Sequence, residues 1–221
     1  MKQANLHVHP SQTSIKSQTG GDFAGLPLGG STPTRLIVGL SGASGMPFAL
    51  RMLEVLQGFS IETHLVASKA AAQTLSVETE NGLEQARALA DHVYSNGDIG
   101  AAIASGSFRA HGMFIIPCSV KTLAEIANGI GSSLLSRAAD VTLKERRRLV
   151  LGVRETPFTL AHLRNMTMVT EMGGIIAPPM PAFYTKGHDI EAQIDHQVQR
   201  WLDLMGLHLD LAPRWGDPGT D

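Results

Sequence analysis

Residues 35–56 read RLIVGLSGASGMPFALRMLEVL, and this stretch decides the fold of the chain. It opens with the apolar run 36–38, in which β-branched residues follow one another without polar alternation, as is typical of a strand buried on both faces. A turn of Gly, Ser and Ala residues comes next, and apolar residues then recur at helical spacing, at Met46, Leu50, Leu53 and Leu56. The stretch therefore predicts a strand, a glycine turn and a helix.

The turn between this strand and this helix has the chemistry of an anion site. Backbone N–H groups at a helix start have no intrahelical partner and can bind a phosphate, and the hydroxyls of Ser41 and Ser44 would add donors. We expect Gly42 to leave space for the phosphate. The spacing matches neither the G-x-G-x-x-G of dinucleotide sites nor a G-K-[ST] loop, so a mononucleotide is predicted. The alternative is a turn that only lets strand and helix pack closely.

The rest of the chain repeats the alternation of strand and helix. Further strands are expected at 61–66, 112–117, 149–153 and 174–177, each separated from the next by helical patterns. This order is typical of a single α/β domain with a doubly wound, Rossmann-like parallel sheet, and 221 residues suit one such domain. Residues 1–34 are rich in Ser, Thr, Gln, Gly and Pro, and we expect them to be a disordered tail.

Four features of the second half of the chain carry predictions about packing. The methionine-rich helix 158–172 should bury its apolar residues in the core, namely Leu160, Leu163, Met166, Met168 and Met172. The last helix, 189–206, should bury Ile190, Ile194, Val198, Leu202 and Met205 and leave Arg200 off that stripe. Arg146, Arg147 and Arg148 are expected to be a solvated helix end, and Trp215 to pack on a neighbouring subunit.

Composition limits the classes of partner. The hydrophobic share is 43%, the charged share 17% and the formal net charge -2, which favours neither nucleic acid nor an anionic membrane as a partner. No apolar run is long enough to span a bilayer, and neither a secretory signal nor a mitochondrial presequence is expected in the tail. The single cysteine, Cys118, is interpreted as a core residue and fits a reducing compartment, so a cytoplasmic protein is expected.

Polar residues follow several of the expected strands. Ligands of open α/β sheets bind at the carboxyl ends of the strands, where the sequence places Ser68, the segment 119–122 and the pair Arg154 and Glu155. Lys121 would add a positive charge suited to a phosphate or a ring carbonyl. Two alternatives remain open: Ser68 as a plain helix cap, and Arg154 with Glu155 as a structural ion pair. Prolines before Tyr184 restrict the backbone and would hold that side chain in place.

Taken together, the motifs match a known family. The segments GLSGASG, THLVASK, SGSF, IPCSVKTL, RAADVTLKERRRLVL, VRETP and PPMPAFY, in this order and at this spacing, closely resemble the flavin prenyltransferases of the UbiX type over about residues 35–215. The resemblance implies a flavodoxin-like domain in that range, with 216–221 as a C-terminal tail, in a homo-oligomer that is typically a dodecamer. It further implies transfer of a dimethylallyl group from dimethylallyl monophosphate to N5 and C6 of reduced FMN. The product, prenylated FMN, would serve UbiD-type decarboxylases.

The resemblance also implies roles for individual residues. FMN would be held by Gly42, Ala43, Ser44, Ser68, Ser119, Val120, Lys121, Thr122 and Arg154. The allylic phosphate would be held by Tyr184 and Arg200, helped by Lys144 and Arg137, while Glu78 and Glu155 correspond to the acid/base glutamates. No clustered aspartates are present to recruit magnesium, so a metal-independent reaction without a metal site is expected. Phe108, Tyr184 and Trp215 are expected to offer π faces to an allylic cation.

Two other functions are compatible with a fold of this kind. An FMN-dependent cysteine decarboxylase would have a catalytic histidine and an asparagine in a proline-methionine motif, where this chain has PPMPAFY. A non-catalytic flavin-binding subunit of an aromatic acid decarboxylase would be expected to lack Glu155, Tyr184 and Arg200, all of which are present.

Overall fold

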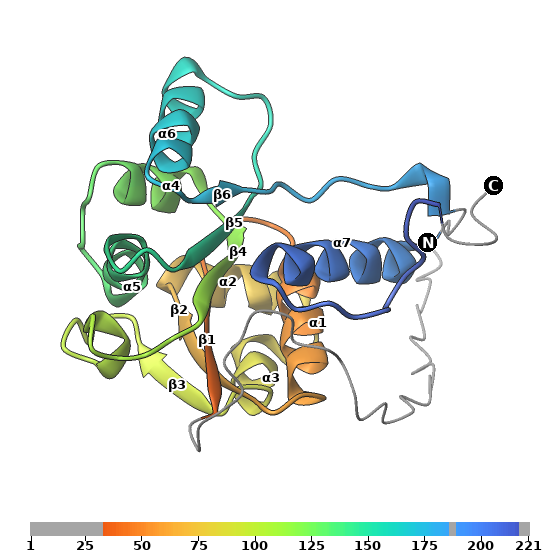
Figure 1. Ribbon diagram of the computed structural model, residues 1–221, viewed down its shortest axis with the longest axis horizontal. Coiled ribbons are helices and arrows are strands. Elements are labelled where there is room, and N and C mark those ends of the chain that lie inside the picture. Colours follow the sequence, from red (N-terminus) through yellow and green to blue (C-terminus); the bar gives the residue numbers. More distant parts are fainter. Residues whose placement is uncertain (1–32, 186–188, 217–221) are drawn as a thin grey trace, which may run out of the picture.

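The computed structural model describes residues 33–185 and 189–216, which form one parallel sheet covered by helices on both faces (Figure 1). The strands are β1 (Thr34–Leu40), β2 (Ile61–Ala67), β3 (His92–Ser95), β4 (Gly112–Cys118), β5 (Arg148–Val153) and β6 (Ile175–Ile176). The helices are α1 (Met46–Gln57), α2 (Lys69–Glu78), α3 (Gly82–Ala88), α4 (Val120–Ala127), α5 (Leu134–Lys144), α6 (Leu160–Glu171) and α7 (Ile190–Met205), with short 3₁₀ turns η1 (Ala102–Ala104) and η2 (Phe183–Thr185). Nearly all of the tail expected at 1–34, and most of that at 216–221, lies outside the described residues.

The strand order confirms the doubly wound sheet. It is β3-β2-β1-β4-β5-β6, and every neighbouring pair is parallel. The order reverses between β1 and β4, so the loops after these two strands flank the topological switch point at which open α/β sheets bind ligands. No helix in the described ranges is both long and apolar enough to cross a membrane.

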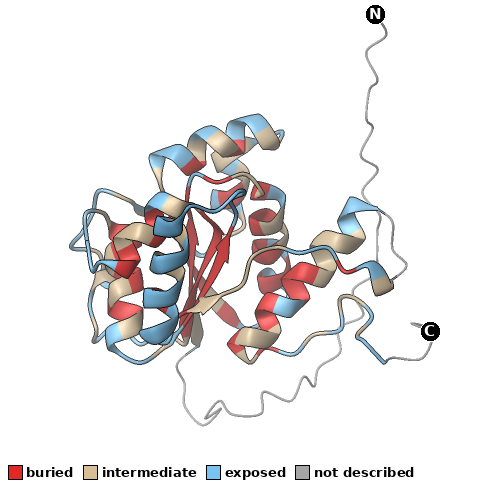
Figure 2. Cartoon of the chain, turned by 90° about the horizontal axis from the view of Figure 1, so that it is seen from above, coloured by how far each residue is buried: buried red, intermediate tan, exposed pale blue. Residues whose placement is uncertain are grey.

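Two apolar cores cover the two faces of the sheet (Figure 2). Successive side chains of a strand point to opposite faces, so β1 places Leu36, Val38 and Leu40 in one core and Ile37 in the other. The first core is completed by α1, α2, α3 and α7, and the second by α4, α5 and α6. Cys118 is fully buried in the second core, as predicted, and this burial raises the pKa of its thiol.

Strand β3 was not predicted from the sequence. It is a four-residue edge strand, and three of its residues are exposed, so it lacks the apolar run by which the other strands are found. It pairs with β2 along its whole length, from His64↔His92 to Ala67↔Ser95. An edge position explains the missing signal, because a strand with a single neighbour and an exposed face needs few apolar residues.

The packing predicted for the last two helices is wrong in part. Leu160, Leu163, Met168 and Met172 are 61%, 48%, 39% and 36% exposed, because only the side of α6 that carries the buried Val169 meets the rest of the chain. On α7, Ile190 is 65% exposed as the first residue of the helix. Trp201, which the apolar stripe did not include, is almost fully buried against the first core.

The arginine cluster after α5 is only partly solvated, contrary to expectation. Arg147 donates to the carbonyl oxygens of Phe108 and Gly106 at 2.6 and 2.7 Å, and Arg148 donates to that of Met205 at 2.6 Å. These arginines therefore tie loops to the amino-terminal edge of β5, away from the switch point.

Candidate functional site

At the switch point, the side chain of Ser41, directly after β1, forms hydrogen bonds to the end of β4. Its hydroxyl donates to the carbonyl oxygen of Pro117 at 3.0 Å and accepts the N–H of Ser119 at 2.7 Å. Through these two bonds the buried hydroxyl of Ser41 links the ends of β1 and β4. The expectation that this hydroxyl would be a donor for a ligand is therefore wrong.

Gly42 follows at a close approach between the turn and α2. A Cβ built on Gly42 would lie 2.4 Å from the Cβ of Ala70 and 3.3 Å from its backbone, which leaves no room for a side chain. The helix is held there by Ser68, whose N–H donates to the carbonyl of Leu40 and whose hydroxyl accepts the N–H of Ala71. Ser68 is thus a helix cap at the carboxyl end of β2, and its role in ligand binding stays a prediction.

The start of α1 already carries an anion, the carboxylate of Glu78. One oxygen of Glu78 accepts the N–H groups of both Gly45 and Met46 at 2.8 Å. Burial by itself raises the pKa of Glu78, but hydrogen bonds from Ser44, Met46 and Gly45 and the charge of Arg154 together hold it below its ordinary value. An external phosphate would therefore have to bind at other amides than these two.

The start of α4 offers such amides on the other side of the switch point. Ser119 caps this helix, and its hydroxyl accepts the N–H of Thr122 at 3.3 Å and contacts the Thr122 hydroxyl at 3.2 Å. The N–H groups of Val120 and Lys121 make no hydrogen bond to any residue that the structure describes. Lys121 itself extends away, with its ammonium group 2.8 Å from Glu125 and its side chain exposed.

Arg154 and Glu155 follow β5 and lie exposed on the same rim. The Cδ of Arg154 would be 3.7 Å from a Cβ on Gly45, and its charge acts on Glu78. Glu155 accepts the N–H of the adjacent Thr156 at 2.9 Å. Within the described ranges the two side chains form no ion pair with each other, so the structural alternative for this pair does not hold. Both remain available to a ligand.

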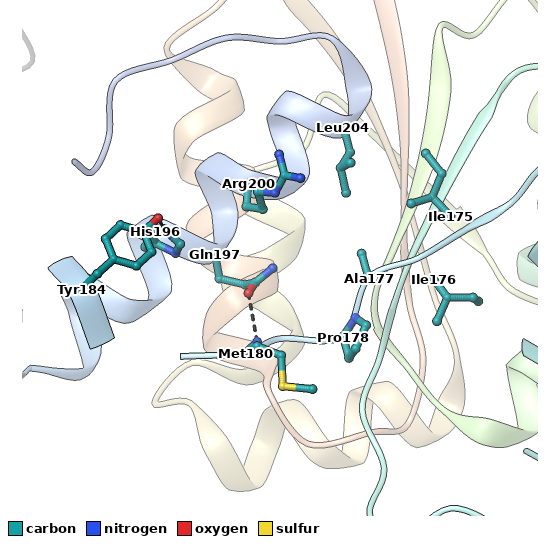
Figure 3. Close-up of a pocket in the computed structure, with 10 residues that line it drawn as sticks. All are labelled: Ile175, Ile176, Ala177, Pro178, Met180, Tyr184, His196, Gln197, Arg200 and Leu204. Atoms are coloured by element: carbon teal, nitrogen blue, oxygen red, sulfur yellow. Dashed lines mark hydrogen bonds between the residues drawn. The ribbon is translucent and has the colours of Figure 1, made fainter. Parts of the chain in front are cut away.

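A second concave region lies beyond β6. A pocket of about 430 Å³ is bounded by β6, the following connection and α7, and Tyr184, His196 and Arg200 line it (Figure 3). Arg200 projects from the exposed side of α7 and forms no hydrogen bond or ion pair with the described residues. Tyr184 contacts His196 through its hydroxyl at 2.7 Å, and the ring of Trp215 stands edge-on to it at 5.1 Å.

Two glutamines of α7 position the connection that carries Tyr184. Gln197 accepts the N–H of Met180 at 3.0 Å, and Gln193 accepts the N–H of Ala182 at 2.8 Å. The sequence pattern indicated the prolines as restraints on this connection, and neither these glutamines nor His196 was predicted. Their spacing with Arg200, on successive turns of one helix face, was the available signal.

Arg137 and Lys144 lie far from this pocket within the chain. Both belong to α5, which covers the opposite face of the sheet from α7. Arg137 donates to Asp140 at 2.8 Å, and Lys144 pairs with Glu145. Phe108 is also separate, since it packs against His64 and beneath Arg35. One chain therefore does not bring these three residues to Tyr184 and Arg200.

A cluster that the sequence did not reveal lies between β1, β2 and β3. Glu62, His64 and His92 place one ligand-type atom each within 4.8 Å of the others. One carboxylate oxygen of Glu62 lies 3.0 Å from the guanidinium of Arg35 and 2.8 Å from Nε2 of His64. This arginine supplies the positive charge that a metal ion would bring, so we interpret the cluster as an internal ion-pair network. The expectation of no metal site stays a prediction.

Comparisons with known proteins show which family the chain is similar to. The sequence pattern of the Flavoprotein family matches residues 28–199. The chain is 53% identical over 184 residues to the flavin prenyltransferase UbiX of Escherichia coli K12, which covers 82% of this chain and 97% of that protein.

Two solved structures have the same fold and substantial sequence identity. AnUbiX (PadA1), in complex with FMN and dimethylallyl pyrophosphate, has a TM-score of 0.82 and 49% identity, covering 84% of this chain and 98% of that one. A dodecameric FMN-dependent UbiX-like decarboxylase from Escherichia coli O157:H7 has a TM-score of 0.81 and 46% identity, covering 82% and 99%.

Proposed function

The chain belongs to the Flavoprotein family and, within it, to the flavin prenyltransferases of the UbiX type, and from this premise we propose the reaction that it catalyses. It transfers a dimethylallyl group from dimethylallyl monophosphate to N5 and C6 of reduced FMN. The product is the prenylated FMN cofactor of UbiD-type decarboxylases. The observation that carries the proposal is a single pocket lined both by the guanidinium of Arg200, uncommitted among the described residues, and by the phenol of Tyr184.

The rim around the switch point fits a flavin mononucleotide. The turn after β1 consists of Ser, Gly and Ala residues, and the amides of Val120 and Lys121 make no hydrogen bond within the described residues and are suited to a phosphate. When bound, reduced FMN supplies the nucleophilic nitrogen and ring carbon of the reaction. The residues that we propose hold it are Gly42, Ala43, Ser44, Ser68, Ser119, Val120, Lys121, Thr122 and Arg154.

Tyr184 and Arg200 are proposed to hold the allylic phosphate. Cleavage of the allylic C–O bond places negative charge on that phosphate, and a guanidinium and a phenol stabilise this charge more in the transition state than in the ground state. Arg137 and Lys144 cover the opposite face of the sheet in the same chain. We therefore propose that they reach the phosphate of a neighbouring copy in the oligomer.

The two glutamates are proposed to have different roles. Glu78 has a lowered pKa and is bound to the α1 amides, so at neutral pH it is a fixed carboxylate that positions the turn. Glu155 is exposed on the rim, and its only hydrogen bond among the described residues is to its neighbour Thr156. It is the better candidate for the base that removes the C6 proton of the flavin.

We also propose an oligomeric state and a cellular location for this protein. The chain forms a homo-oligomer, which we expect to be a dodecamer like the related Escherichia coli O157:H7 protein. A cytoplasmic location is supported by the single cysteine, which is free and buried. Residues 35–215 are proposed as the catalytic domain, with 1–34 and 216–221 as tails. An accessory subunit is not favoured, because Glu155, Tyr184 and Arg200 are all present, and a cysteine decarboxylase is not favoured, because PPMPAFY lacks the asparagine expected there.

The direct test is mass spectrometry of the bound flavin after incubation with reduced FMN and dimethylallyl monophosphate. We expect a mass increase that corresponds to one dimethylallyl group, and the same yield in excess EDTA, since cations of the protein neutralise the phosphate. Arg200→Ala should lower both binding of the allylic phosphate and turnover, whereas Glu155→Gln should lower turnover with binding retained. Unmodified FMN in every incubation would overturn the proposal.

A further inference from the structure

His196 is the unexplained residue of the pocket that contains Tyr184 and Arg200. It lies one helical turn before Arg200 on α7, and its Nε2 is 2.7 Å from the hydroxyl oxygen of Tyr184. Its other ring nitrogen, Nδ1, is buried and has no hydrogen-bond partner within the part of the chain that the structure describes. A buried polar atom without a partner is uncommon in a folded protein and calls for a physical reason.

The unpaired Nδ1 distinguishes between two arrangements of protons. A neutral imidazole has one N–H donor and one bare acceptor nitrogen. If Tyr184 donated to Nε2, the N–H would be at Nδ1 and would be buried without an acceptor. If Nε2 carries the hydrogen and donates to the phenol oxygen, only a lone pair at Nδ1 is left unpaired. Buried N–H groups without an acceptor are rarer than incompletely used acceptors, so the second arrangement is favoured.

The surroundings of His196 keep the ring neutral. Burial lowers the pKa of His196, and the positive charges of Arg200 and Arg214 lower it further. The ring of Tyr184 is held in turn by two edge-on neighbours, His196 at 5.5 Å and Trp215 at 5.1 Å between ring centroids. The ring position of Tyr184 is thus fixed by packing, and the direction of its hydroxyl proton is left to His196.

We propose that His196 is a positioning residue that donates its Nε2–H to the phenol oxygen of Tyr184, so that the hydroxyl proton of Tyr184 points at the substrate phosphate. A hydroxyl that accepts one hydrogen bond is polarised and donates a stronger one, so the chain from His196 through Tyr184 to the phosphate is cooperative. The inference rests on the proposed function of Tyr184 as a phosphate ligand. It adds a residue through which that ligand is oriented.

Three substitutions separate hydrogen bonding from packing. His196→Leu removes the donor, and His196→Asn keeps a polar group that is too short to reach the phenol. His196→Gln places an amide N–H at about the position of Nε2 and should restore the donor. Each is made in the parent and in a Tyr184→Phe background, where no phenol oxygen is left to accept. Flavin content and melting temperature are recorded for every protein.

The measurement is the Kd of dimethylallyl monophosphate for the FMN-loaded oligomer by titration calorimetry, together with KM and kcat for prenylation. His196→Leu and His196→Asn should each weaken binding about three- to tenfold, the range expected for one lost hydrogen bond. His196→Gln should stay within about twofold of the parent. In the Tyr184→Phe background all three changes should have no further effect on binding.

Other results would contradict either the role of His196 or the proposed phosphate site. If His196→Gln binds as weakly as His196→Leu, or if His196→Leu weakens binding by the same factor with and without the Tyr184 hydroxyl, the role of His196 is only structural and the inference is overturned. If Tyr184→Phe weakens binding and His196→Leu does not, the inference fails while the proposed phosphate site stands. Parent-like binding by Tyr184→Phe itself removes the proposed phosphate site and the inference with it.

Discussion

Gly42 is constrained by the helix beside it, since a Cβ at this position would overlap Ala70. We predict that Gly42→Ala lowers the free energy of unfolding by about 1 to 3 kcal/mol, the usual cost of overpacking, and lowers FMN content because the turn must shift. Thermal unfolding and flavin absorbance measure the two effects. Gly97→Ala is the matched control, because a Cβ there would meet only Ser95 Oγ at 3.8 Å.

The same position allows a sharper comparison. In the double variant Gly42→Ala, Ala70→Gly, the atom that would overlap first, the Cβ of Ala70, is removed. Gly42→Ala should therefore lower the free energy of unfolding and the FMN content less in the Ala70→Gly background than in the parent. Equal losses in both backgrounds would show that the glycine is needed for another reason, such as direct contact with the phosphate.

Glu78 links the stability of the turn to pH. Its pKa is lowered in the folded chain, so its contribution is complete above the unfolded value of about 4.3 and disappears as the pH falls through the folded pKa. Glu78→Gln keeps the shape but removes the charge at the start of α1, which should cost about 1 kcal/mol at pH 7. For a chain of this length that is a melting temperature about 2 to 4 °C lower.

The pH profile decides whether this charge is the cause. The difference in melting temperature between the parent and Glu78→Gln should be constant from pH 8 to pH 6 and shrink towards zero in acid. Glu84 on α3, which is exposed and pairs with Arg87 on its own helix, provides the control, since Glu84→Gln should change little at any pH. A Glu78→Gln difference that persists unchanged below the folded pKa would contradict the assignment.

Among the structural elements, α7 supplies much of the lining of the pocket that we propose for the substrate. Its glutamines hold the connection after β6 in place, and the indole N–H of its Trp201 donates to the carbonyl of Ala177 at 2.8 Å. The elements that carry the proposed FMN site are different, because that site lies in the loops after β1, β2, β4 and β5. We therefore expect that the pocket can be disturbed without a loss of flavin binding.

Gln197→Met tests this separation. Methionine has a similar length but no carbonyl oxygen, so the buried side chain would leave the N–H of Met180 without its acceptor. We expect KM for dimethylallyl monophosphate to rise several-fold and stability to fall by about 1 to 2 kcal/mol, while the FMN content stays that of the parent. Steady-state kinetics with flavin quantitation measures both. A parallel loss of flavin would show that the pocket and the rim are a single unit.

At the scale of the whole molecule, the exposed apolar residues of α6 indicate an assembly. Phe158, Leu160, Leu163, Met168 and Met172 are all at least 36% exposed on one helix and its lead-in, where burial against another copy would remove apolar area from water. The separation of α5 from the pocket is consistent with this assembly, because the phosphate role that we propose for Arg137 and Lys144 requires a neighbouring copy.

We predict that the parent protein scatters light as a species many times heavier than the 23.6 kDa chain. Leu163→Glu should shift this mass towards smaller species and reduce prenylation, because a charge would be buried at a contact repeated by symmetry. Gln57→Glu, at the exposed end of α1 on the other face of the sheet, should leave the mass unchanged. A Leu163→Glu protein with the parent mass would place the interface elsewhere.

The sequence by itself determined the fold class and most of its elements. Apolar runs such as 36–38 and 112–117 have no polar alternation, so they specify strands buried on both faces, and the glycine turn after the first strand specifies the switch point. It also determined which side chains belong to the rim, because residues that follow a parallel strand must lie at its carboxyl end. Among the strands of the described residues, only the edge strand β3, with few apolar residues, has no such pattern.

The tertiary structure decided how those residues are used, since their partners come from distant parts of the chain. It showed that Glu78, more than 30 positions after the start of α1, is the anion at that helix. It also showed that the hydroxyl of Ser41 donates to the carbonyl of Pro117 on β4. It placed Arg137 and Lys144 across the sheet from Tyr184, and His196 against the phenol. Periodicity and local spacing report which face a residue occupies, whereas contacts between elements depend on how the whole sheet is wound.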